Sequence, residues 1–195
     1  MKAIILSAGR GSRLLPLTES KPKCLLEFMG KSVLRHQLTA LDKAGVDHVT
    51  VVTGFLPQLV EEDVSLWDGR MPVSTLFNPF FQVADNLASC WMARDTMKGG
   101  FMLLNGDTLV SQPLVDRVVD TNDWPISVTI DRKPAYDEDD MKVTLDGGRL
   151  KAIGKRLRPE ETDAESIGFL KFSAEGADLF RETVEQMMRT QDGIS

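Results

Sequence analysis

The sequence predicts an α/β fold with a Rossmann-like, mainly parallel sheet and helices on both of its faces. Short apolar runs at 3–6 and 101–104 have the length and composition of buried strands. Segments with helical spacing of apolar residues alternate with such runs, as in folds built on parallel strands. A chain of 195 residues suits one domain, 1–195, with a small appendage, and it is long enough to bury a core.

The elements follow from local signals. After the strand at 3–6, a helix is expected over 33–44, because Ser32 is a suitable N-cap, leucines recur on one face and Gly45 is a suitable stop. The elements expected next are a strand at 48–53, a weak helix at 57–63, a strand at 71–77, a helix at 87–97 capped by Asp85 or Asn86, a strand at 101–104, a helix at 113–121 and a strand at 126–131.

The segment 132–172 has a different character and predicts a small β-rich appendage to the sheet. A hairpin joins 142–145 to 149–153 across Asp146-Gly147-Gly148. A further strand is expected at 166–172, followed by a C-terminal helix over 174–190 whose apolar residues have helical spacing.

Composition excludes several classes of protein. The net charge of -6 argues against a nucleic-acid binder, which would need a basic face. No apolar run approaches transmembrane length, so no membrane association is expected. The N-terminal residues lack the pattern of a signal peptide. Cys24 and Cys90 have no metal-ligand spacing, and together these features favour a cytoplasmic location.

The loop after the first strand carries the strongest functional signal. In Leu6-Ser7-Ala8-Gly9-Arg10-Gly11-Ser12-Arg13-Leu14, two glycines allow a sharp turn and close approach to a ligand. Backbone N–H groups in such a loop can point at phosphate oxygens, and Arg13 and Lys23 add positive charge. A simple tight turn is the alternative. A dinucleotide fingerprint would need a glycine where Leu14 stands, and a Walker loop is absent.

The full string resembles the signature of the nucleotidyltransferases that activate sugar phosphates and alcohol phosphates. The family pattern is Leu-x-Ala-Gly-x-Gly-x-Arg-Leu-x-Pro-Leu-Thr, followed by Pro-Lys. It is matched here at every position, by Leu6, Ala8, Gly9, Gly11, Arg13, Leu14, Pro16, Leu17, Thr18, Pro22 and Lys23. The resemblance implies that 1–131 binds the nucleotide and that 132–172 faces the acceptor.

Asp107 is the second anchor of the predicted site. It follows the buried strand 101–104 directly, where open α/β sheets place their ligands. A carboxylate there can hold Mg²⁺ against a triphosphate, although Asn105-Gly106-Asp107 is also ordinary turn chemistry. The resemblance implies the metal role. Enzymes of the family often supply a second aspartate from a later strand, and Asp192 is not a convincing substitute.

The helix start at Asn86 bears on nucleotide choice. Asn86 and Ser89 lie three residues apart, on one helical face, and could contact a base or ribose; helix capping and ordinary solvation are the alternative. The stretch Asp85-Asn86-Leu87-Ala88-Ser89 resembles the branch of the family that transfers CMP to phosphocholine or inositol phosphate. We therefore expect Leu6, Ser7, Ala8, Gly9, Gly11, Arg13, Asn86 and Ser89 to bind the nucleotide.

The acceptor side is predicted from the same resemblance. Lys155 is expected to neutralise the acceptor phosphate, and Glu165 and Gly168 lie on the expected acceptor strand, where a glycine permits close approach. A solvated surface lysine is the alternative for Lys155. The acidic run 137–140 is expected to be a solvated loop rather than a cation site. Trp91, Trp124 and Tyr136 could contribute to a cation-binding box, although Trp91 is expected in the core.

The resemblance implies an Mg²⁺-dependent cytidylyltransferase as the function. Arg13, Lys23 and Asp107 would be the catalytic residues, with CTP and a small phosphorylated acceptor (phosphocholine, inositol phosphate or aminoethylphosphonate type) as substrates and pyrophosphate as a product. The alternatives are a sugar-1-phosphate nucleotidyltransferase and a non-catalytic nucleotide-binding relative. A homodimer is compatible with these expectations.

Overall fold

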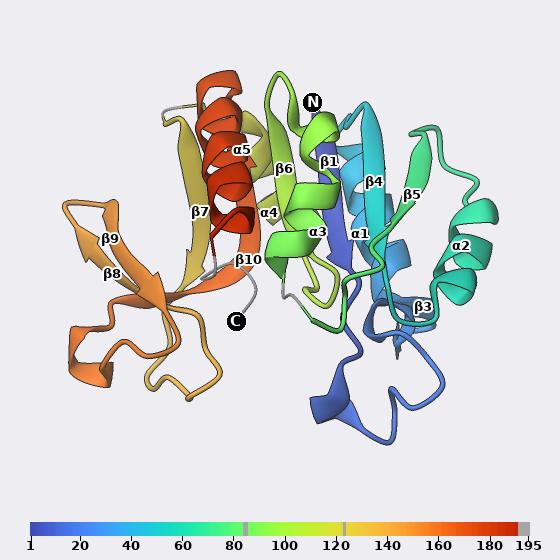
Figure 1. Cartoon of the computed structure of the whole chain (residues 1–195), viewed down its shortest axis with the longest axis horizontal. Coiled ribbons are helices and arrows are strands. Elements are labelled where there is room, and N and C mark those ends of the chain that lie inside the picture. Colours follow the sequence, from blue (N-terminus) through green and yellow to red (C-terminus); the bar gives the residue numbers. More distant parts are fainter. Residues whose placement is uncertain (84–85, 123, 191–195) are drawn as a thin grey trace.

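A computed structural model describes residues 1–83, 86–122 and 124–190. A twisted sheet runs through the middle of the molecule, and helices cover both of its faces (Figure 1). The strands lie in the order β5-β4-β1-β6-β10-β8-β9, and β7 also pairs with β10. The mixed α/β fold with a mainly parallel sheet is therefore confirmed.

The parallel half of the sheet holds the first strand at its centre. β1 pairs in parallel with β4 on one side and β6 on the other, so that Lys2 lies opposite His48 and Phe101. β4 pairs in parallel with β5. The strands are β1 (Lys2–Ser7), β4 (His48–Thr53), β5 (Val73–Phe77) and β6 (Phe101–Asn105).

Two layers of helices bury the two faces of these strands. Alternate residues of β1 point to opposite faces, so Ile5 packs in a cluster with α1 and α4, while Ile4 packs in a cluster with α3 and α5. Figure 1 shows α3 and α5 in front of the sheet and α1 and α4 behind it. The helices are α1 (Val33–Lys43), α2 (Pro57–Ser65), α3 (Asn86–Met92), α4 (Gln112–Asp120) and α5 (Ala174–Met188).

The antiparallel half of the sheet is organised by β10. β7 pairs with both ends of β10, whereas β6 pairs with its C-terminal residues and β8 with its N-terminal residues. β6 and β8 therefore share the other edge of β10, separated by a short gap. β8 and β9 form the expected hairpin. These strands are β7 (Ile126–Asp131), β8 (Lys142–Asp146), β9 (Arg149–Gly154) and β10 (Ala164–Phe172).

Most helix and strand boundaries lie close to those predicted from local sequence signals. The Ser32 hydroxyl accepts a hydrogen bond from the Arg35 N–H, as expected of an N-cap. The helix predicted over 87–97 is wrong in its second half, where a 3-10 turn spans Arg94–Met97. There the Arg94 guanidinium and the Thr96 hydroxyl bond the carbonyls of Trp91 and Ala93, which competes with regular helix. A short hairpin of β2 (Glu27–Phe28) and β3 (Lys31–Ser32) was not predicted.

None of the helices in the described ranges combines the length and the apolarity needed to cross a bilayer. Asp85, the alternative cap of α3, lies outside the described residues, and Asn86 is the first residue of the helix.

Candidate active site

A cleft of about 680 Å³ opens at the carboxyl ends of β1 and β6 and extends toward β10. This is the edge at which open α/β sheets bind ligands, because the neighbouring strands end there together. Its lining comes from the first loop, the end of β6, the segment 139–141, Lys155 and the start of β10. The lining residues are Leu6, Ser7, Gly9, Gly11, Ser12, Arg13, Lys23, Cys24, Asn86, Asn105, Gly106, Asp107, Thr108, Asp139, Asp140, Met141, Lys155, Glu165, Ser166 and Ile167.

The glycine-containing loop is fixed by hydrogen bonds from Phe55 and Thr18 and is open toward the cleft. The Ala8 carbonyl accepts a 2.9 Å hydrogen bond from the Phe55 N–H, and the Thr18 hydroxyl donates a 2.8 Å bond to the Gly11 carbonyl. Gly11 has a φ of 68°, a backbone conformation that favours glycine. A Cβ at Gly9 would meet no atom within 4 Å, so the backbone there borders open space that a ligand can approach.

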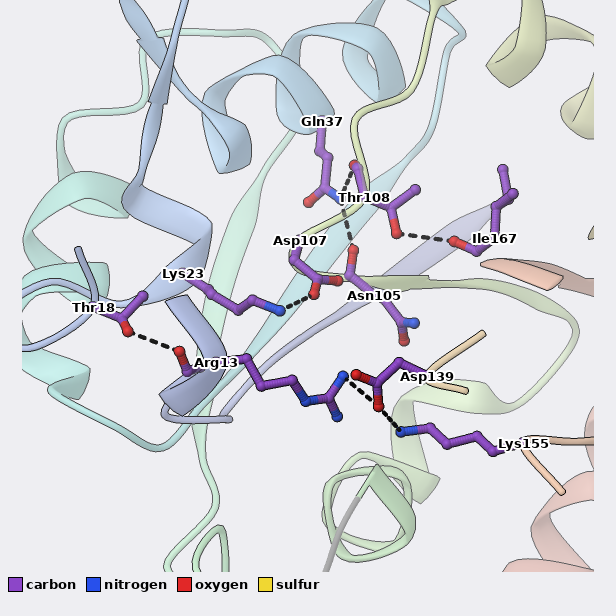
Figure 2. A network of polar contacts seen from close by, with 11 residues as sticks. Arg13, Thr18, Lys23, Gln37, Asn105, Asp107, Thr108, Asp139, Lys155 and Ile167 are labelled. Atoms are coloured by element: carbon purple, nitrogen blue, oxygen red, sulfur yellow. Dashed lines mark hydrogen bonds and ion pairs between the residues drawn. The ribbon is translucent and has the colours of Figure 1, made fainter. Parts of the chain in front are cut away.

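Three cations converge on the cleft from distant parts of the chain, and Figure 2 shows each beside a carboxylate. Lys23 forms an ion pair with Asp107. Arg13 Nη1 lies 3.0 Å from Asp139 Oδ1, and Lys155 Nζ lies 3.6 Å from the same oxygen. A single carboxylate oxygen thus bridges a cation of the first loop and a cation that follows β9. The cluster is suited to two anionic groups placed side by side.

Asp107 projects from a turn that is tied to the strands around it. The Gly106 N–H donates a 2.8 Å hydrogen bond to the Leu6 carbonyl, and a Cβ at Gly106 would lie 2.1 Å from the Ser7 hydroxyl. Only a glycine fits this contact between the ends of β1 and β6. The close approach brings Asp107 to the cleft beside Lys23.

The donor set at Asp107 suits Mg²⁺. In the described part of the chain, no three histidine, cysteine or acidic side chains gather as a ready-made metal site. Magnesium is commonly bound by one or two carboxylates together with substrate phosphates and water, and Asp107 supplies one such carboxylate in an open cleft. Asp192 lies outside the described residues.

The acidic run 137–140 lies in a loop whose first three residues are exposed, as expected, but two of its members are also part of the site. Asp139 and Asp140 line the cleft. Asp139 pairs with Arg13 and Lys155, and Asp140 Oδ2 lies 2.7 Å from Lys133 Nζ. Sequence alone does not reveal these partners, because they come from three separate segments of the chain.

Lys133 joins the acidic run to β10. Its ammonium lies between Asp140 and Glu165, at 2.7 and 3.0 Å. Hydrogen bonds to these carboxylates raise the pKa of Lys133, and the Lys133 ammonium lowers the pKa of Asp140. Glu165 reaches the cleft as predicted, but with its charge already paired.

The backbone of Lys155 is fixed by a hydrogen bond to its carbonyl. Lys142, which is buried, donates a 3.0 Å hydrogen bond from its ammonium to the Lys155 carbonyl. This contact fixes the end of the β8–β9 hairpin, from which the Lys155 side chain points toward Asp139 (Figure 2).

Three predicted site residues do not line the cleft. Ala8 is a buried residue of the loop, and its carbonyl accepts the hydrogen bond from Phe55. Ser89 is 2% exposed and accepts a 3.0 Å hydrogen bond from Asn78, so the structure places it in the interior while Asn86 borders the cleft. Gly168, with a φ of 73°, packs against Asn105, since its Cβ would lie 2.1 Å from Asn105 Nδ2.

The aromatic residues do not form a shared cation box. Each lies near a different cation of the protein: Trp91 near Arg94, Trp124 near Arg149 and Tyr136 near Lys133. Trp91 is half-buried and donates a hydrogen bond to Glu185 on α5.

Sequence reasoning missed the polar frame of the Asp107 turn. Asn105 and Thr108 flank it and line the cleft, together with Ser166 and Ile167 on β10. The Asn105-Gly106-Asp107-Thr108 string was visible at the end of a predicted strand. The contact between the Thr108 hydroxyl and the Ile167 carbonyl of β10 was not visible, because it depends on the antiparallel pairing of β6 with β10, which has no local sequence signal.

Comparisons with known proteins show to which family the chain belongs. The sequence model described as "Nucleotidyl transferase" matches residues 2–139. The chain belongs to this family. The matched segment contains the glycine loop, Lys23, the Asp107 turn and the acidic run as far as Asp139, so the family likeness includes most of the cleft. The reaction class of the chain is therefore nucleotidyl transfer.

The curated relatives include a cytidylyltransferase and several guanylyltransferases. The CTP:phosphoglutamine cytidylyltransferase of Campylobacter jejuni is 26% identical over 192 residues, covering 89% of this chain and 73% of that protein. The mannose-1-phosphate guanylyltransferase catalytic subunit beta of Dictyostelium discoideum is 34% identical over 118 residues, covering 60% of this chain. The chain spans only about a third of the length of that guanylyltransferase.

Solved structures share the fold of the whole chain. The CTP:phosphocholine cytidylyltransferase from Streptococcus pneumoniae superposes with a TM-score of 0.79 at 18% identity, covering 100% of this chain and 80% of that one. The inositol-1-phosphate CTP transferase from T. maritima gives a TM-score of 0.76 at 20% identity, covering 93% and 74%. The appendage is therefore part of the nucleotidyltransferase fold.

Proposed function

We propose that this protein is a cytidylyltransferase that transfers CMP from CTP to a small phosphorylated alcohol or phosphonate and releases pyrophosphate. The observation that carries the proposal is the convergence of Arg13, Lys23 and Lys155 on one cleft that also holds Asp107. Two anions must be brought together for this reaction, and these cations come from both sides of the cleft.

In the proposed reaction, an acceptor phosphate oxygen attacks the α-phosphorus of CTP in line. A bond forms between that oxygen and the phosphorus, and the bond to the bridging oxygen breaks, so that pyrophosphate leaves with the electron pair. The acceptor phosphate is already an anionic nucleophile, which removes the need for a serine or cysteine nucleophile activated by a histidine.

The cleft residues would divide this work by position. Arg13 would hold the β- and γ-phosphates beside the glycine loop, and Lys155 would hold the acceptor phosphate. Lys23 would lie between the α-phosphate and the acceptor phosphate and stabilise the charge that develops there. Asp107 would hold Mg²⁺, which supplies further charge neutralisation when bound. Arg13 and Lys155 now share the Asp139 carboxylate, so that group would give way to phosphate.

The preference for CTP is supported by the cytidylyltransferase relative, which matches 89% of this chain, including the segment after the family-matched region. Asn86 borders the cleft where a nucleotide base or ribose would reach the start of α3. Candidate acceptors of this class are phosphocholine, inositol phosphate and aminoethylphosphonate. The name of the cytidylyltransferase relative adds phosphoglutamine, which is neither an alcohol phosphate nor a phosphonate.

A sugar-1-phosphate nucleotidyltransferase is the second candidate. It is supported by the guanylyltransferase relatives, whose likeness is higher in identity but covers only 60% of the chain. The two functions differ in the nucleotide they use, so nucleotide preference separates them.

A thermal-shift series with CTP, UTP, GTP, ATP and dTTP, each with Mg²⁺, tests the proposal. Binding to the native state raises the melting temperature by mass action. The largest shift with CTP, followed by pyrophosphate release with one of the candidate acceptors, would support the cytidylyltransferase. A larger shift with GTP, UTP or dTTP would support the sugar-phosphate function. No shift with any nucleotide would overturn both.

A further inference from the structure

One buried polar side chain connects helix α1 to the site. Gln37 is 0% exposed and lies on the same buried face as Leu34, Leu38 and Leu41. An amide among leucines is costly unless it is hydrogen-bonded. Its partners are therefore informative about why an amide stands in this position.

The Gln37 amide nitrogen binds both sides of the Asp107 turn. Nε2 donates a 2.8 Å hydrogen bond to the Asn105 carbonyl and a 2.8 Å bond to the Thr108 carbonyl (Figure 2). These two carbonyls bracket Gly106 and Asp107 in the chain. Both amide hydrogens are thus used, and one side chain holds the residues before and after the proposed metal ligand.

The orientation of this amide is determined by its surroundings. Rotating it by 180° would place Oε1 against two carbonyl oxygens, which cannot donate to it. In the observed orientation, Oε1 is buried and has no hydrogen-bond partner among the described residues. A buried acceptor without a partner lowers stability. In this orientation the carbonyls of Asn105 and Thr108 are hydrogen-bonded, while Gln37 Oε1 is not.

The turn is also tied on its far side. The Thr108 hydroxyl donates a 2.9 Å hydrogen bond to the Ile167 carbonyl of β10. Ile167 lies in the short stretch of β10 between the residues paired with β8 and those paired with β6. The bonds from Gln37 on α1 and from Thr108 to β10 therefore hold the Asp107 turn to two different elements.

We propose that Gln37 is a positioning residue that fixes the Asp107 carboxylate in the geometry needed to bind the divalent cation. The proposal rests on the proposed function, in which Asp107 holds Mg²⁺. Gln37 acts through the backbone of the turn. Without it, the two carbonyls lose their partner and the turn samples other conformations, so metal affinity falls while the cleft keeps its charges.

Gln37→Met tests the proposal, because it keeps the length of the side chain and removes both donors. Mn²⁺ is the metal probe, and its binding in the presence of CTP is followed by electron paramagnetic resonance. We expect the dissociation constant for Mn²⁺ to rise about tenfold, the scale typical of lost outer-shell support. Leu41→Val is the matched control. It removes a methylene from the same buried face of α1 and should leave Mn²⁺ affinity unchanged.

Hydrogen exchange in the ligand-free protein provides a second measurement that does not depend on activity. The Gly106 and Thr108 amides, which bond the Leu6 and Asn105 carbonyls, should exchange faster in Gln37→Met than in Leu41→Val at matched global stability. Should Gln37→Met fail to fold, Thr108→Val releases the other side of the turn. It should then produce the same two changes, smaller in size.

The outcomes separate the two proposals. Unchanged exchange at the turn, or unchanged Mn²⁺ affinity despite Mn²⁺ binding to the wild type, would overturn the role of Gln37. Absence of Mn²⁺ binding to the wild type would overturn the metal role of Asp107 in the proposed function. Exchange at Gly106 and Thr108 would then decide whether Gln37 holds the turn.

Discussion

Asp139 occupies the position between Arg13 and Lys155 where phosphate is proposed to bind, so removing its charge should strengthen nucleotide binding. Its Oδ1 lies 3.0 Å from Arg13 Nη1 and 3.6 Å from Lys155 Nζ. A triphosphate that takes Arg13 must break the first of these contacts. In Asp139→Asn, the cations are released before the nucleotide arrives, and the ligand no longer competes with a carboxylate.

The exposure of these side chains sets the size of the effect. Arg13 and Asp139 are 65% and 61% exposed, and Lys155 is 43% exposed. Ion pairs of this kind contribute about 0.5 kcal/mol each, and the nucleotide must break only the pair between Asp139 and Arg13. That energy corresponds to about a twofold decrease in the dissociation constant.

Isothermal titration with Mg²⁺ and the nucleotide that gives the largest thermal shift measures this constant. Glu138→Gln is the matched control. It removes the same charge one residue away, at an exposed side chain that forms no ion pair in the described ranges. Affinity that is unchanged in Asp139→Asn, or weaker than in the control, would refute the reasoning and indicate that Asp139 contributes directly to ligand binding.

Three further predictions concern catalysis, backbone geometry and thiol chemistry. Lys23→Ala should reduce turnover by orders of magnitude, because it removes the charge proposed to lie between the reacting phosphates. The melting temperature and circular dichroism should stay near those of the wild type. Steady-state pyrophosphate release measures turnover, and near-normal turnover would remove Lys23 from the mechanism. Gly168→Ala should lower the free energy of unfolding in urea by about 2 kcal/mol, because of its positive φ and its contact with Asn105. Gly45→Ala, at a similar φ of 74° with open space around it, is the control and should lose less. Burial raises the pKa of the two cysteine thiols to about 11 and about 12, so both should resist alkylation in the folded protein at pH 8 and react once it unfolds; rapid labelling of the native protein would contradict this.

The parallel half of the fold was predictable because its signals are local. The strand expected at 48–53 is β4, and Ser32 caps α1 as predicted. Apolar runs and helix caps are recognised from residues that are neighbours in the sequence. The parallel direction of the strands then follows from their alternation with helices. The pairing of β10 was not predictable in this way. Its partners β6, β7 and β8 are antiparallel and distant in sequence.

The same distinction applies to the site. The glycine loop, Lys23 and Asp107 were found because each follows a strand end or belongs to a contiguous string. The ion pairs of Asp139 were not expected, since its partners Arg13 and Lys155 are remote in the sequence. Gln37 carried no signal, because a glutamine on a helix is ordinary. Only the folded structure shows that its amide meets the turn at Asp107.

The attachment of the β8–β9 hairpin has a practical consequence for protein engineering. The hairpin joins β10 through only two residue pairs, Ala164 with Val143 and Glu165 with Lys142, whereas the rest of β10 is paired with β6 and β7. We therefore expect that residues 142–154 can be exchanged as a cassette between relatives without disturbing the strands that carry the glycine loop and Asp107. None of these residues lines the cleft, so libraries confined to this cassette would vary how the next residue, Lys155, is presented to it.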